Sequence, residues 1–239
     1  MRKTQFAATP EHQLKQQFSP PTNNPAAQRK KRFTRRTKTE IKMDNYVYTI
    51  GNKIYINLTN RCSNNCNFCI RQGRQGMNGT TLWIHDEPTA EDIVSQLPQN
   101  MDDFDSEVVF CGFGEPTYNL DVLDEVASYL HCTDKTTRIN TNGQGNLIHK
   151  RDITDVIVTS CDVINVSLNE STAEKYQKHC KSIFGTSAFS ALLEFAKLCK
   201  QRGGNVVFSV VDSIGEKDVA ECQKLADSLG IPLRVRVKE

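Results

Sequence analysis

The chain has 239 residues, of which 38% are hydrophobic, and this length suits one domain with a sizeable core better than two. No stretch approaches the roughly 18–20 consecutive apolar residues that a membrane span requires, which excludes a transmembrane helix. The amino terminus also lacks the apolar block of a secretory signal. We therefore expect a soluble, cytoplasmic protein with no membrane partner.

The net charge of +2 hides an uneven distribution. Residues 1–42 carry 11 Lys and Arg side chains against two acidic ones, a balance of +9, which leaves −7 for residues 43–239. The basic segment is rich in Gln, Pro and Asn, so we expect a disordered N-terminal extension at 1–42 without catalytic function. Its basic run at 29–36 could instead contact RNA, a membrane surface or an import receptor. The acidic remainder, one expected domain at 43–239, is not predicted to bind nucleic acid.

Short β-rich runs alternate with helical patterns from residue 46 onward. The expected strands cover residues 53–59, 107–112, 137–143, 163–169, 205–211 and 232–238. Helical periodicity is expected after Thr89, from Asn119, through 189–199 and through 219–229. Thr89 and Asp92 resemble a capping box, and Gly230 should end the last helix. Alternating strands and helices predict parallel strands joined by right-handed crossovers.

Several of these strands alternate between apolar and polar residues. In the first, Ile54, Ile56 and Leu58 share one face and leave Asn57 and Thr59 on the other. The strand at 232–238 alternates in the same way, with apolar residues expected against the helices. A partly open barrel with a polar interior explains both faces, whereas a flat, doubly covered sheet does not. An antiparallel sheet with one face in solvent is the alternative, although the helix-length connections disfavour it.

Three cysteines, Cys62, Cys66 and Cys69, occupy eight residues directly after the first expected strand. This loop lies at the carboxyl edge of the sheet, where parallel α/β folds place their active sites. A zinc site would need a fourth ligand, and His85 is the nearest histidine. Chance clustering of buried cysteines is a second reading, and an iron-sulfur cluster with one open iron is the third. The six other cysteines fall singly, and most of them are expected to be buried thiols in a reducing compartment.

The cysteine segment CSNNCNFC fits the C-x3-C-x2-C signature of the radical SAM superfamily, with aromatic Phe68 before the last cysteine. CGFGEPT at 111–117 is similar to the GGE motif of that superfamily, with Phe113 in place of its first glycine. NTNG at 140–143 and VSLN at 166–169 also stand where the superfamily places cofactor contacts. Across residues 46–237 these segments resemble the TatD-linked radical SAM proteins.

The resemblance implies a partial (β/α)6 barrel, the incomplete TIM-like barrel of the radical SAM core. It implies a 4Fe-4S cluster held by Cys62, Cys66 and Cys69, with S-adenosyl-L-methionine (SAM) on the fourth iron. Reductive cleavage of SAM then gives a 5'-deoxyadenosyl radical that abstracts hydrogen from an unidentified small-molecule, nucleotide or protein substrate. The expected partners are an electron donor such as a flavodoxin or ferredoxin and, by association, a TatD-type metal-dependent hydrolase. The alternative function is a non-catalytic iron-sulfur or zinc protein.

The resemblance assigns cofactor contacts to Phe68, Gly114, Glu115, Asn140, Asn142, Ser167 and Asn169. Glu115, with Gly114, is expected to bind the methionine ammonium of SAM, and Ser167 and Asn169 its ribose. No side chain is assigned a catalytic role.

Each polar position in this set also has a simpler interpretation. Glu115 could cap a helix. Asn140 and Asn142 could be turn residues. Ser167 and Asn169 could be strand-end polar groups satisfied locally.

Overall fold

The computed structural model describes residues 44–77 and 79–237, and the expected extension at 1–42 lies outside the described residues. The strands are β1 (Val47–Ile50), β2 (Lys53–Ile56), β3 (Gly76–Met77), β4 (Thr80–Thr81), β5 (Glu107–Phe110), β6 (Thr136–Thr141), β7 (Val163–Ser167), β8 (Val206–Val211) and β9 (Leu233–Arg236). The α-helices are α1 (Ala90–Gln96), α2 (Leu120–His131), α3 (Gly145–His149), α4 (Thr154–Ser160), α5 (Ala173–Cys180), α6 (Ser187–Gln201) and α7 (Glu216–Leu229). Short 3-10 turns are η1 (Met101–Asp103), η2 (Pro116–Asn119) and η3 (Asp212–Ile214).

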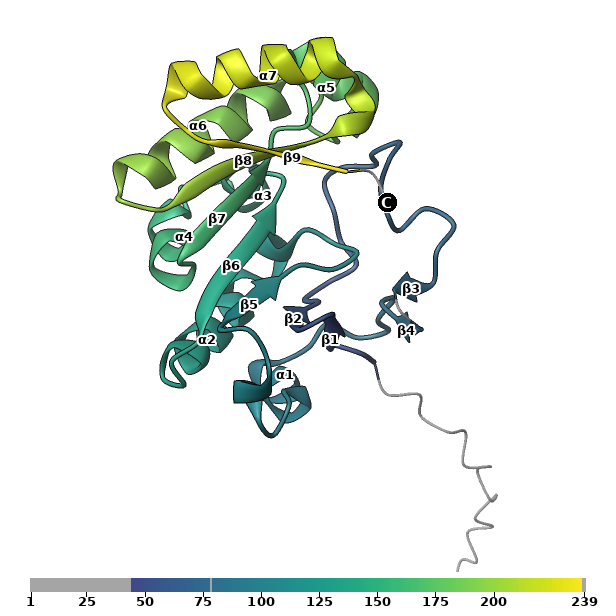
Figure 1. The fold of residues 1–239 in the computed structure, drawn as a ribbon, viewed down its shortest axis with the longest axis vertical. Helices are drawn as coiled ribbons and strands as arrows, with labels where there is room; N and C mark the ends of the chain where they lie inside the picture. The colour runs from purple at the N-terminus through teal and green to yellow at the C-terminus, as the bar shows by residue number, and fades with distance from the viewer. Residues whose placement is uncertain (1–43, 78, 238–239) are drawn as a thin grey trace, which may run out of the picture. The chain divides into compact units, whose positions relative to one another are not determined.

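Within these residues, seven strands form one sheet in the order β1-β2-β5-β6-β7-β8-β9. From β2 to β9 every neighbouring pair is parallel, and the strands follow one another in chain order. The helices lie along one side of the strands, and the segment with β3 and β4 lies on the other (Figure 1). This architecture confirms the predicted partial (β/α)6 barrel and contradicts the antiparallel alternative.

The local signals at two helix ends are confirmed. Thr89 and Asp92 form the capping box that opens α1, with Asp92 N donating to Thr89 Oγ1 at 3.2 Å and Thr89 N to Asp92 Oδ2 at 2.9 Å. Gly230 closes α7 in the left-handed conformation, at φ 59°. None of the described helices is long and apolar enough to cross a bilayer.

The apolar faces of the strands are buried where helices cover them. Ile54, Ile56 and Leu58 are at most 2% exposed, as the alternation predicts. The prediction is wrong at the last strand, where Val235 is 48% and Val237 81% exposed. β9 is the edge of the sheet, and no described helix follows it to cover these two residues.

Candidate cofactor site

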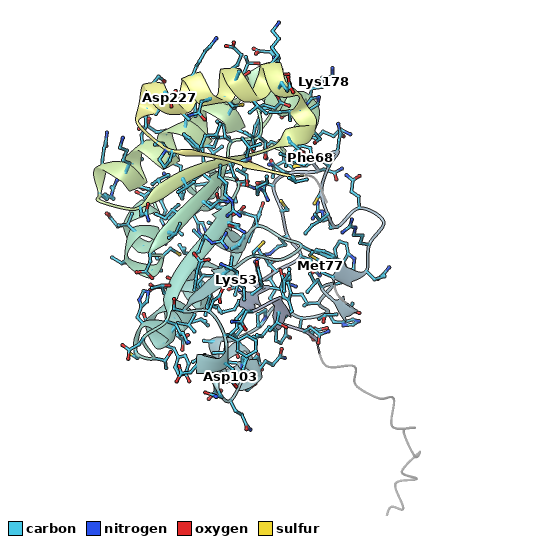
Figure 2. The ribbon with its side chains drawn as sticks, in the orientation of Figure 1. Lys53, Phe68, Met77, Asp103, Lys178 and Asp227 are labelled. Carbon is cyan, nitrogen blue, oxygen red and sulfur yellow. The ribbon has the colours of Figure 1, made fainter. Side chains whose placement is uncertain are left out.

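The cysteine loop, residues 62–69, follows β2 and is fastened to the end of α5. The backbone amides of Asn65 and Asn67 donate to the carbonyls of Cys180 and His179, each at 2.9 Å. Free carbonyls at a helix C-terminus are natural acceptors for such a loop. α5 therefore holds the middle of the loop at the carboxyl edge of the sheet (Figure 2 labels Phe68 of this loop and Lys178 of α5).

The three predicted ligands are half-buried free thiols. Cys66 is within electrostatic reach of both Cys62 and Cys69. Burial raises the pKa of Cys62 to about 12 and also raises the pKa of Cys69. In the part of the chain that the structure describes, no three Cys, His, Asp or Glu side chains surround a point suited to a single metal ion. The thiols therefore share one loop without forming a preassembled site for one ion.

A fourth thiol contacts this group. Cys180, fully buried at the end of α5, lies beside Cys66, and its proximity together with burial raises the pKa of Cys66. Asn169 Nδ2 donates to Cys180 Sγ at 3.8 Å. In the sequence Cys180 is one of six separate cysteines, because 111 residues of chain separate it from Cys69.

Glu115 lies behind the loop, 3% exposed, and accepts hydrogen bonds from three neighbours. Oε1 accepts from the hydroxyls of Thr141 at 2.7 Å and Thr117 at 2.9 Å, and Oε2 accepts from the backbone amide of Asn142 at 2.7 Å. Burial raises the pKa of this carboxyl group, although these hydrogen bonds favour the charged form. Glu115 also caps η2 by accepting from Thr117 N at 3.3 Å, the contact that the simpler interpretation predicts.

Gly114 is required by the chain's own packing. A Cβ atom there would lie 2.2 Å from the carbonyl oxygen of Thr59 and 2.7 Å from that of Arg61. The next residue, Glu115, donates its amide to Arg61 O at 2.7 Å. The motif after β5 therefore packs directly on the backbone that leads into the cysteine loop, and a larger residue at 114 would push the two apart.

Asn142 connects the end of β6 to the first cysteine. Its Nδ2 donates to Ser63 Oγ at 2.9 Å and lies 3.9 Å from Cys62 Sγ, which also accepts from Asn64 N at 3.4 Å. Asn142 Oδ1 accepts from the amide of Gln144 at 2.9 Å, a local turn contact that the simpler interpretation of this residue predicts. Two N–H groups therefore point at the Cys62 sulfur, an environment that suits a thiolate.

A buried polar network below the loop was not anticipated from the sequence. Gln144 Nε2 donates to Asn64 Oδ1 and to Tyr176 OH, and Asn64 Nδ2 donates to the same hydroxyl, all at 2.9 Å. Ser182 Oγ donates to Gln144 Oε1 at 2.8 Å. These four side chains are at most 5% exposed and join the cysteine loop, β6 and α5. Their contacts span up to 112 residues, a separation for which local patterns give no signal.

Arg71 is a second residue that the sequence analysis missed. Its guanidinium donates to the carbonyls of Asn64 at 3.1 Å, Asn60 at 3.4 Å and Phe113 at 3.5 Å. Its charge acts on all three cysteines of the loop and favours their thiolate forms. The sequence offered one indication that Arg71 belongs to the site, its position two residues after Cys69.

The remaining predicted polar contacts lie apart from Glu115. Asn140 faces the barrel interior, where its Oδ1 accepts from Arg138 at 2.9 Å and from Asn165 at 3.2 Å. Ser167 lies at the carboxyl end of β7, where it is in register with Ser209 of β8. Asn169 follows it in the left-handed conformation, at φ 59°, and its Oδ1 is buried without a hydrogen-bond partner among the described residues. Such strain in a non-glycine residue is typical of functional positions.

Two aromatic residues of the predicted motifs, Phe68 and Phe113, pack against other apolar side chains. Phe68 packs on the main core. Phe113 is 3% exposed and makes an edge-to-face contact with Trp83, their ring centroids 5.1 Å apart. The replacement of the motif's first glycine therefore serves a small aromatic core beside β1 and the β3–β4 hairpin.

An iron-sulfur cluster suits the chemistry of these residues. Thiolates are the normal ligands of such clusters, and the loop offers three with Arg71 and two N–H donors beside them. Ligand thiols must lose their protons on binding, a step that Arg71 favours. The buried Glu115 carboxylate supplies an anionic site for a cation behind the same loop.

Comparison with known proteins identifies the superfamily. The family model of the radical SAM superfamily matches residues 56–228, and the chain belongs to that superfamily. A search of curated protein sequences returned no match.

Solved structures share the fold at low sequence identity. SuiB of Streptococcus suis, bound to S-adenosylmethionine, has 17% identity and a TM-score of 0.60 over 80% of this chain and 41% of SuiB. A radical SAM methyltransferase from Sphaerobacter thermophilus has 14% identity and a TM-score of 0.53 over 80% of this chain and 68% of its own. TYW1 with a lysine-pyruvate adduct has 17% identity and a TM-score of 0.53, covering 79% of this chain and 65% of TYW1. The chain thus spans only about two fifths of SuiB.

Proposed function

We propose that the protein is a radical SAM enzyme that reductively cleaves SAM at a 4Fe-4S cluster held by Cys62, Cys66 and Cys69. When bound, the cluster and SAM supply a 5'-deoxyadenosyl radical, which abstracts hydrogen from the substrate. The observation that carries the proposal is the convergence of the half-buried cysteine loop and the Glu115 segment at one edge of the sheet. The sheet and its helices lie between residues 47 and 236, which supports a core domain at 43–239.

The protein's own residues have separate tasks in this proposal. Glu115 receives the methionine ammonium, since its carboxylate is already oriented by Thr141 and the Asn142 amide. Gly114 keeps that carboxylate close to the cysteine loop. Asn142 donates to Cys62 Sγ at 3.9 Å, a contact that favours the thiolate that a cluster requires.

Four further positions of the predicted set remain proposals. Phe68 contributes backbone contacts to adenine. Ser167 and Asn169 bind ribose hydroxyls, for which the unpartnered Asn169 Oδ1 is suited. Asn140 faces the barrel interior with Arg138 and is assigned to the substrate side of the cofactor.

Within the superfamily, we assign the chain to the TatD-linked radical SAM proteins. The sequence segments 111–117, 140–143 and 166–169, on which that resemblance depends, follow or end β5, β6 and β7 at the same edge of the sheet. The proposed substrate is a small molecule, a nucleotide or a protein, the electron donor is a flavodoxin or ferredoxin, and the protein acts in the cytoplasm. A pull-down with a TatD-type hydrolase from the same organism tests the proposed association.

The contact between Cys66 and Cys180 favours one competing function. A cluster with four cysteine ligands would be closed and would serve structure or electron transfer. A zinc site is less well supported, because His85, its nearest histidine in the sequence, is paired with Asp44 at 2.7 Å.

Anaerobic reconstitution tests the proposal. The wild-type protein should bind about four irons per chain and, once reduced with dithionite, convert SAM to 5'-deoxyadenosine and methionine. Cys66→Ala should lose both the cluster and the cleavage. Cys199→Ala, in the buried face of α6, is the matched control and should keep both. Bound zinc, or a complete cluster that leaves SAM intact, would refute the proposal.

A further inference from the structure

We propose that the outer surface where α5 meets the cysteine loop is the docking site for a small acidic electron-transfer protein. This inference depends on the proposed function, because only a protein with a reducible cluster needs such a partner. We call the surface the loop face and define it by five exposed residues, Asn65, Asn67, Lys178, Lys181 and Ile183.

The loop face lies directly over Cys66. The two asparagines flank this cysteine and donate their amides to α5 carbonyls at 2.9 Å, and Asn67 Nδ2 reaches Lys178 O at 3.5 Å. On the other side, the amide of Ile183 donates to Ser63 O at 2.9 Å. Backbone contacts therefore join the exposed surface to the cluster ligands with no intervening layer. Electron transfer between proteins requires such close approach.

The charge of this surface is opposite to that of the domain. Residues 61–74 contain three arginines and residues 175–183 three lysines, and neither segment contains an Asp or Glu, although residues 43–239 carry −7 overall. Of these arginines, Arg61 is paired with Glu87 at 2.6 Å. Lys175 is paired with Asp218, but neither Lys178 nor Lys181 forms an ion pair within the described residues. Both charges are therefore available to attract an acidic partner.

An apolar centre indicates that the partner is a protein rather than a nucleic acid. Ile183 is 71% exposed and stands two residues from Lys181. An apolar contact surrounded by cations is typical of protein interfaces, and transient redox complexes need only a small contact area. Lys181 is the left-handed C-cap of α5, at φ 48°, and its amide donates to Gln177 O at 3.0 Å.

Charge reversal separates docking from chemistry. At low salt, flavodoxin hydroquinone should reduce the variant Lys178→Glu/Lys181→Glu about tenfold more slowly than wild type. High salt should make the rates of the two proteins more similar. Cluster absorbance in an anaerobic stopped-flow instrument measures this rate. Ile183→Ser should also slow the reaction without changing its salt dependence. Dithionite, a small reductant, should drive SAM cleavage equally in all these proteins.

Lys197→Glu/Lys217→Glu, on exposed positions of α6 and α7, is the matched control and should behave as wild type. Iron content and circular dichroism establish that each variant is folded and loaded. Equal flavodoxin rates in wild type and the loop-face variant would overturn the inference. An equal loss of the flavodoxin rate in the control variant would also overturn the inference. The inference would likewise fail if dithionite reduced the wild-type cluster but neither flavodoxin nor ferredoxin did. If dithionite yields no 5'-deoxyadenosine even from the wild type, the proposed function fails instead.

Discussion

The backbone amide of Asn142 donates to the Oε2 atom of Glu115 at 2.7 Å, and the Asn142 side chain reaches Cys62 Sγ at 3.9 Å. One residue at the end of β6 thus connects the carboxylate behind the loop to the first proposed cluster ligand. Changes at this junction should therefore affect cofactor binding and folding to different degrees.

Glu115→Gln should weaken SAM binding by about tenfold, because it removes the charge but keeps an acceptor for the surrounding donors. Glu115→Ala should weaken SAM binding and also lower the free energy of unfolding by about 2 kcal/mol, because buried donors lose their acceptor. Equilibrium dialysis and urea denaturation measure the two effects. Glu125→Gln, exposed on α2, is the control. Unchanged SAM affinity in Glu115→Gln would remove Glu115 from the cofactor site.

Tyr176→Phe should destabilise the protein by about 1–3 kcal/mol, since the side-chain amides of Asn64 and Gln144 each donate one N–H to its hydroxyl, and these two buried N–H groups would lose their acceptor. Tyr129→Phe provides the matched control, because Tyr129 is 41% exposed. Urea denaturation gives both values. If the two variants were equally stable, the network would not support the cysteine loop.

Phe113→Ala should lower the free energy of unfolding by about 3–5 kcal/mol, as for other buried phenylalanines. It should also shift the fluorescence of Trp83, the single tryptophan of the chain, to longer wavelength, because Phe113 shields that ring. Phe195→Ala in the main core should be similarly destabilising but leave the native-state spectrum unchanged. An unshifted spectrum in Phe113→Ala would contradict the packing described for the small aromatic core.

Asp162 should make folding sensitive to acid. Burial raises the pKa of its carboxyl group, but hydrogen bonds from Thr137 and His131 outweigh this effect and lower it overall. A lowered pKa in the folded state means that the stabilisation is complete above the unfolded value of about 3.9 and is lost as pH falls through the folded value. Wild type should therefore lose more stability than Asp162→Asn between about pH 6 and pH 3, measured by urea denaturation. If the stability of wild type and of Asp162→Asn fell equally with pH, Asp162 would not be a source of the acid sensitivity.

The sequence predicted the elements with strong periodicity. The strands from β2 to β9 in the main sheet and the longer helices α2, α6 and α7 stand where alternation or helical spacing placed them. The helices α3, α4 and α5, with 5, 7 and 8 residues, were missed because so few turns give no clear period. β1 was missed because the expected strands alternated with helical segments along the chain. β1 instead pairs directly with β2 as an antiparallel strand.

The site was predictable only where its residues are close in sequence. The cysteine triplet and the Glu115 motif are local; the triplet stood out from its spacing, and the Glu115 motif from its resemblance to the GGE motif of the superfamily. Gln144, Tyr176 and Cys180 meet the loop only because α5 packs beside it, so their contacts depend on the fold. The prediction that the apolar face of β9 is buried was wrong for a related reason. Alternation shows that residues share a face of a strand, but not whether a helix covers that face.

The central claim is that one iron of the cluster has no protein ligand, although Cys180 lies beside Cys66. Electron paramagnetic resonance of the reduced cluster, before and after addition of SAM, tests this directly in wild type and Cys180→Ala. We predict that SAM changes the spectrum in both proteins, because it binds the open iron in each. A wild-type spectrum that SAM leaves unchanged, with a response gained only in Cys180→Ala, would show that Cys180 occupies that position and would contradict the account.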